Sequence, residues 1–131
     1  MEAFDLEKEE VWDSIRRVEK FLGKTAEGDY TVACWEPGQS SPNHCHPDAT
    51  EIYFCYSGGG KMKMSDGSVV DISPGGFIVH PPGELHEYVN GPDRSLLFRV
   101  RYGGDKKSRT KNWPSNSDWK QNLEDSKYFK S

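Results

Sequence analysis

The sequence lacks the features that would place the protein in a membrane or on a nucleic acid. No stretch of its 131 residues approaches the roughly 20 consecutive apolar residues of a membrane-spanning helix. The first thirty residues carry acidic side chains and no apolar run of the signal-peptide kind. A basic excess is also missing, because the net charge is -4 and gives no overall attraction to a polyanion. We therefore expect a cytoplasmic protein that binds neither membrane nor nucleic acid.

Cysteine is scarce as well. The three cysteines, Cys34, Cys45 and Cys55, are an odd number in a chain without export signals. A disulfide framework is therefore not expected, and the three thiols are predicted to be reduced, small and buried. A chain of this length forms one ordinary domain with a core of its own.

The N-terminal segment has the spacing of a helix. Apolar residues recur at steps of four, three and four between Val11 and Leu22, and Gly23 follows as a stop. This pattern predicts a helix over residues 5–22, within a lead-in of residues 1–29, that lies on the outside of the domain.

From Tyr30 the apolar period changes from helical to two. Short runs rich in β-branched and aromatic residues follow one another up to Tyr102, separated by turn sequences at intervals of roughly 8 to 12 residues. The pair Asp66-Gly67, between two alternating runs, indicates a hairpin. About eight short strands without a helix predict an antiparallel barrel or jelly roll over residues 30–102.

Residues 103–131 are polar and contain Trp113 and Trp119. Their polarity is typical of a disordered tail, whereas the tryptophans favour a segment that docks on the barrel or on a partner subunit. We expect the docked arrangement.

Two of the four histidines stand one residue apart. Because side chains alternate along a strand, His44 and His46 share one face, and the turn that follows brings Glu51 back toward them. A carboxylate beside two imidazoles is the outline of a divalent-cation site. The fragment alone leaves open a pair of surface histidines beside an acid. Further along, His86 lies on a strand behind a tight Pro-Gly turn, where it could supply a third imidazole.

With this second stretch, the sequence resembles the cupin superfamily, as a small single-domain member. The first cupin motif, read at its specified positions, is met by Gly38, His44, His46, Glu51 and Gly58. The second is met by Gly75, Pro81, Gly83, His86 and Asn90. The first motif is most similar to that of germins, which are longer and secreted, so no substrate is carried over from them.

The resemblance implies an all-β fold, the cupin double-stranded β-helix or jelly-roll barrel, with the N-terminal helix and C-terminal extension added to it. It also implies that His44, His46, Glu51 and His86 hold one divalent metal ion, and that Asn90 is structural. Cupins typically hold six-coordinate ions with two adjacent positions open. Manganese, iron or nickel would suit the site best, with zinc and cobalt as alternatives.

Alternation from Glu51 also places Tyr53 on the metal-facing side and Ile52 and Phe54 outside. Tyr53 is therefore either a catalytic proton donor or a filler of the barrel, and the filler is favoured. His80, outside both motifs, is predicted to be structural, with a place at the pocket mouth as the alternative.

Two arginines on the last strand, Arg99 and Arg101, share a face opposite Phe98 and Val100. If the apolar residues fill the barrel, both arginines lie outside, and this parity is favoured. With the opposite parity they would enter the pocket and could hold a carboxylate or phosphate.

Two classes of function fit these residues. In the first, the protein is a metal-dependent enzyme acting on a small oxygenated metabolite, with an oxygenase or decarboxylase of a small organic acid favoured over an isomerase or lyase. In the second, it is a non-catalytic cupin that senses or stores a metal or ligand. The outward apolar side chains further predict a homodimer.

Overall fold

The computed structural model describes residues 1–41, 43–103 and 109–110. Apart from one short 3-10 helix, η1 (Leu6–Glu9), the elements in this part of the chain are β-strands. They are β1 (Val18–Lys24), β2 (Gly28–Trp35), β3 (His44–Cys45), β4 (Ala49–Ser57), β5 (Gly60–Met64), β6 (Val69–Ile72), β7 (Phe77–His80), β8 (His86–Asn90), β9 (Ser95–Gly103) and β10 (Arg109–Thr110). The all-β prediction is confirmed.

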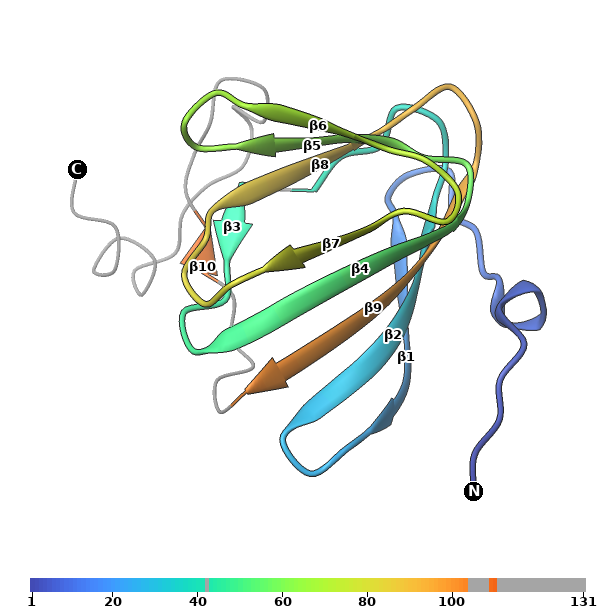
Figure 1. Ribbon diagram of the computed structural model, residues 1–131. Helices are drawn as coiled ribbons and strands as arrows, with labels where there is room; N and C mark the ends of the chain where they lie inside the picture. The colour runs from blue at the N-terminus through green and yellow to red at the C-terminus, as the bar shows by residue number, and fades with distance from the viewer. Residues whose placement is uncertain (42, 104–108, 111–131) are drawn as a thin grey trace.

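The strands form two antiparallel sheets that face each other (Figure 1). The first has the order β1-β2-β9-β4-β7, and the second the order β10-β3-β8-β5-β6. Consecutive strands mostly alternate between the sheets, so residues far apart in sequence lie side by side, as β2 and β9 do. The hairpin predicted at Asp66-Gly67 joins β5 and β6, and Gly67 adopts the positive φ of 88° that its turn requires.

The helix predicted over residues 5–22 is wrong. Only η1 is helical there, and the end of the segment is the edge strand β1, paired with β2 from Val18 onward. Of the apolar side chains that suggested a helix, Val18 and Leu22 instead pack on the outer face of the sheet, against a buried cluster of Val32, Cys34 and Leu96, whereas Val11 and Ile15 are exposed. Pairing along the edge of β2 supplies backbone hydrogen bonds, so the tertiary structure overrides the local periodicity.

Other expectations are confirmed where the chain is described. The three cysteines are free and buried. Asn90 is structural: its amide donates hydrogen bonds to the backbone oxygens of Glu36 and Asp93, both at 2.9 Å, and its oxygen accepts one from the Tyr88 hydroxyl at 2.8 Å. The tryptophans of the tail lie outside the described residues.

The inner face of the first sheet changes from apolar to charged along its length. Cross-strand register defines three rows of inward side chains over β2, β9, β4 and β7. They are Ala33, Leu97 and Cys55; then Thr31, Arg99, Tyr53 and Ile78; then Asp29, Arg101, Glu51 and His80. The apolar end packs into the main core around Trp35, Met62 and Tyr88. The charged end is where the candidate site lies.

Candidate metal centre

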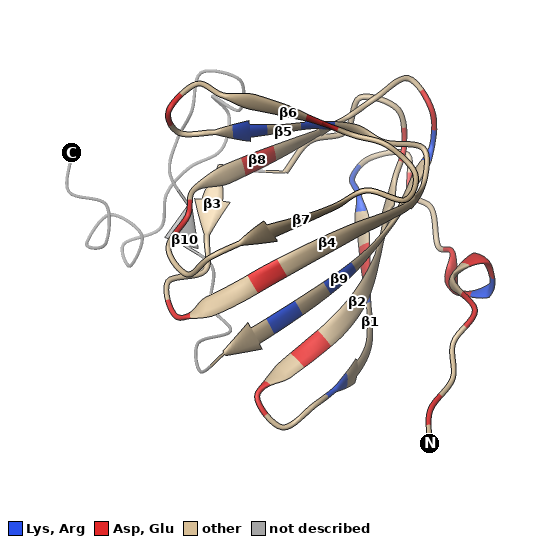
Figure 2. Ribbon diagram, in the orientation of Figure 1, with Lys and Arg blue, Asp and Glu red and all other residues tan. Residues whose placement is uncertain are grey.

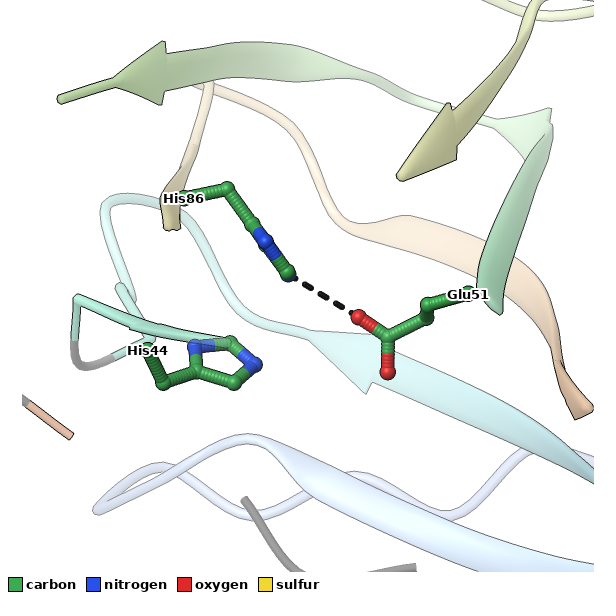
Figure 3. Close-up of side chains that lie close together, drawn as sticks. All are labelled: His44, Glu51 and His86. Carbon is green, nitrogen blue, oxygen red and sulfur yellow. Dashed lines mark hydrogen bonds and ion pairs between the residues drawn. The ribbon is translucent and has the colours of Figure 1, made fainter. Parts of the chain in front are cut away.

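Three predicted ligands meet inside the barrel, at the charged end. His44 on β3, Glu51 on β4 and His86 on β8 each offer a ligand atom within 4.8 Å of the others, and all three side chains are buried. His44 and His86 are direct register partners in the second sheet, whereas Glu51 comes from the first. Figure 3 shows the three side chains turned toward a common space. The cluster could therefore hold a metal ion.

His46, the fourth predicted ligand, does not belong to that group of three but adjoins it. Its Nε2 lies 2.9 Å from Oε2 of Glu51. Both atoms are buried, and within the described part of the chain neither has a well-oriented hydrogen-bond partner. Two buried polar atoms this close, without a well-oriented hydrogen bond, are suited to a shared partner, since leaving them unsatisfied is costly. A cation between them meets this requirement, so the residues present fit a metal ion.

The orientation of His86 is set by the turn before its strand. Its Nδ1 donates to the backbone oxygen of Glu84 at 2.9 Å, which leaves Nε2 to face Oε1 of Glu51, also at 2.9 Å. Gly83, with φ of 82°, makes this turn possible, and its N–H donates to the backbone oxygen of His46 at 3.0 Å. A backbone acceptor on the distal nitrogen is the usual way in which a protein fixes a ligand histidine.

Glu51 is a carboxylate in this setting. Burial alone would raise its pKa, but the adjacent imidazoles of His46 and His86 outweigh burial and hold the pKa well below its ordinary value. A buried carboxylate that stays ionised among histidines is suited to a cation.

Sequence reasoning treated His80 as structural, and the structure places it beside the cluster. It is the register partner of Glu51 on β7, and only 1% of its surface is exposed. Its ring stacks on that of His86 at 3.7 Å and 4°. Its Nδ1 lies 3.0 Å from Oε2 of Glu84, and burial lowers its pKa to about 4. The sequence signal that could have placed His80 in the site is the alternation of side chains along its strand. Using this signal requires knowing which strand pairs with it.

The expectation that Arg99 and Arg101 lie outside the barrel is wrong. Arg99 is the register partner of Tyr53 and is 6% exposed, and Arg101 is the partner of Glu51. Phe98 instead faces outward, where it lines a surface cavity with Leu6 and other residues of the N-terminal segment and the sheet. On the outside of the barrel, the N-terminal segment and neighbouring strands therefore cover the apolar side chains of β9.

The interior can take these arginines because carboxylates surround them. Arg99 lies 3.5 Å from Asp29 and 3.7 Å from both Glu19 and Glu51, and Arg101 lies 3.7 Å from Glu51. Figure 2 shows the basic segments of β9 between acidic segments of β2 and β4. Buried charges persist only when paired in this way.

Tyr53 points inward and Ile52 and Phe54 point outward, as alternation predicts. The Tyr53 ring belongs to the main core cluster and meets the rings of His80 and His86 edge-on, with centroids 6.2 Å and 6.4 Å away. Burial raises its pKa above the ordinary value, so its hydroxyl keeps its proton.

Fold and site together define a class of protein: a double-stranded β-helix with an inward cluster of histidines and a carboxylate. The family model for the cupin domain matches residues 31–98. The chain belongs to the cupin family.

Among curated proteins, the chain is similar to Gentisate 1,2 dioxygenase 1 from Aquipseudomonas alcaligenes, with 31% identity over 62 residues. That match covers 47% of this chain but only 18% of the relative, so the chain spans less than a fifth of the protein it resembles.

Solved structures show the same fold. An uncharacterized conserved protein with a double-stranded beta-helix domain from Klebsiella pneumoniae matches with a TM-score of 0.78 and 19% identity, over 86% of this chain and 99% of that one. The DMSP lyase DddQ from Ruegeria pomeroyi matches with a TM-score of 0.65 and 22% identity, over 72% and 51% of the two chains. Among the described residues, there is no helix long and apolar enough to cross a membrane.

Proposed function

We propose that the protein is a metal-dependent cupin enzyme that acts on a small organic acid, as an oxygenase or decarboxylase. The observation that carries this proposal is the buried histidine and glutamate cluster with two arginines on the adjoining strand. A cluster that served only to stabilise the fold would have little reason to bury three imidazoles, a carboxylate and two guanidinium groups together.

The metal would be held by His44, His46, Glu51 and His86. Imidazole with carboxylate suits manganese, iron and nickel, and zinc or cobalt would also fit. When bound, such an ion polarises an oxygen of the substrate and stabilises negative charge that develops there, and iron or manganese adds dioxygen chemistry.

The charges around the site favour an acid as substrate. Three carboxylates, Glu19, Asp29 and Glu51, are balanced by three arginines, Arg17, Arg99 and Arg101, which lie within 4.0 Å of them. These six charges cancel when the histidines are neutral. The carboxylate of Glu84, which accepts the hydrogen bond of His80, adds one negative charge, so a divalent ion leaves an excess of +1. In a buried site this excess charge is expected to attract an anion.

The protein's own residues also exclude water and orient the substrate. The apolar row of Ala33, Leu97 and Cys55 closes the barrel behind the cluster, because all three side chains are buried. Arg101, on the row of Glu51, is the residue we assign to the substrate carboxylate, since a guanidinium can bind it through two parallel hydrogen bonds.

The names of the similar proteins support an enzyme without deciding its reaction. One is called a dioxygenase and another a lyase. A lyase or isomerase is therefore the alternative reaction, and a cupin that senses or stores a ligand is the alternative class.

The experiment is turnover of a panel of 2-oxo, 2-hydroxy and dicarboxylic acids by iron- and manganese-loaded protein, with oxygen uptake followed in parallel. His86→Ala serves as the metal-depleted control. Arg101→Gln should raise KM several-fold for the acid that turns over, whereas the matched variant Arg94→Gln, at a half-exposed surface arginine, should leave KM unchanged. If no acid is consumed or perturbs the spectrum of the metal, the enzyme proposal fails and the sensor class replaces it.

A further inference from the structure

One buried nitrogen beside the cluster, Nε2 of His80, lacks a hydrogen bond within the described part of the chain. Nε2 of His80 is buried, since the side chain is 1% exposed, and it has no hydrogen-bond partner among residues 1–41, 43–103 and 109–110. A buried polar atom left unpaired is costly, so such an atom calls for a partner, which the described residues do not supply. His80 is not one of the four residues assigned to the metal.

The hydrogen bond of the other ring nitrogen, Nδ1, determines whether the partner of Nε2 must be a donor or an acceptor. Nδ1 of His80 bonds Oε2 of Glu84 at 3.0 Å. A carboxylate can only accept, so the ring proton resides on Nδ1. Nε2 is then an acceptor, and its partner must donate a proton.

The stacked rings show where Nε2 points. His80 and His86 are parallel within 4° and 3.7 Å apart. Both Nδ1 atoms bond the same residue, Glu84, one through its side chain and the other through its backbone oxygen. Both Nε2 atoms therefore point away from Glu84 in the same sense, and that of His86 ends at Glu51. Nε2 of His80 therefore faces the space beside Glu51, displaced from Nε2 of His86 by the stacking of the two rings.

We propose that His80 is a specificity-determining residue whose Nε2 accepts a hydrogen bond from a donor group on the metal-bound ligand. Resting on the proposed function, this names the substrate class: an acid with a hydroxyl group beside its carboxylate. A 2-oxo acid of the same shape presents a carbonyl oxygen there, which would meet the lone pair of Nε2 without a proton between them. The row register places Arg101 and His80 on opposite sides of Glu51, so the carboxylate and the hydroxyl have separate partners.

A merely structural His80 would act by stacking on His86, and the test must separate the two roles. Lactate and pyruvate are suitable probes, because they have the same charge and nearly the same shape but differ in the hydroxyl proton. Cobalt-loaded protein reports their binding through its visible spectrum, without turnover. The variants are His80→Phe, which keeps a flat ring for stacking, and His80→Gln, which keeps an acceptor near the position of Nε2.

The wild-type protein should bind lactate about tenfold more tightly than pyruvate, the ratio expected for one buried hydrogen bond. His80→Phe should lose this preference by weakening lactate alone, and His80→Gln should recover part of it. Cobalt content and thermal stability are measured for each variant, to show that the site is intact.

Two results would overturn the proposal. The first is a wild-type protein that binds pyruvate as well as lactate, a comparison that needs no variant to fold. The second is a His80→Phe variant that weakens both acids equally, which is the signature of a structural role. If neither acid perturbs the cobalt spectrum, this proposal fails, while the proposed function is decided separately by the wider panel of acids. Binding of both acids without preference refutes the role of His80 alone.

Discussion

Replacing His80 should change how acid destabilises the metal-free protein. The pKa of His80 is lowered to about 4, first by burial and then by the charge of His86, whereas an unfolded histidine has a pKa of about 6.5. At a pH between these two pKa values, this histidine binds a proton in the unfolded chain but not in the folded chain. Acidification through this interval therefore favours unfolding, and the stability is present above the unfolded pKa and lost as pH falls.

The size of the effect follows from the two pKa values. At pH 7 the residue is mostly neutral in both the folded and the unfolded chain, so its effect on the free energy of unfolding is small. At pH 5 an unfolded histidine is almost fully protonated, while about one-tenth of His80 is protonated in the fold. Each pH unit between the two pKa values lowers the free energy of unfolding by about 1.4 kcal/mol. His80 therefore contributes a loss of about 2 kcal/mol between pH 7 and pH 5.

The assay is urea unfolding of EDTA-treated protein, followed by tryptophan fluorescence at several pH values. His80→Gln cannot be protonated, so its free energy of unfolding should fall by about 2 kcal/mol less than that of the wild type over the same interval. The rest of the chain is the same in the two proteins, so its contribution largely cancels in this comparison. Equal losses in the two proteins would refute a neutral, buried His80.

Two further predictions concern the metal and the assembly. Replacing His86 by alanine should strongly lower the metal content measured by mass spectrometry, whereas His80→Ala should not, and equal metal loss in the two variants would show that the assigned ligand set is wrong. Metal affinity should also fall steeply below pH roughly 6, where protons compete for the imidazoles. The full chain should be a homodimer, since the outer face of the first sheet exposes Phe77, Val79 and Tyr102 by 67%, 50% and 55%, and light scattering that finds only monomer at micromolar concentration would contradict it.

Local sequence determined the strands and the outline of the site. Alternation in a strand is a property of the backbone, so it placed Tyr53 and Glu51 on one face and Phe54 on the other before any partner was known. The turns were equally local, because Gly67 and Gly83 adopt positive φ values that favour glycine. The motif spacing then indicated that His44 and His86 would converge on one point, as they do.

Only the tertiary structure decided which face of each element had a partner. The N-terminal segment has apolar residues at helical spacing, but the open edge of β2 made it a strand, and residues far away in the sequence cover its apolar side. The parity of β9 was decided in the same way: Glu51 and Asp29, distant in sequence, balance the charges of Arg99 and Arg101 in the interior. His80 joined the site through its pairing with Glu51 and its stacking on His86. A sequence records the side chains, but the cost of burying a charge or leaving a nitrogen unpaired depends on neighbours that only the folded chain brings together.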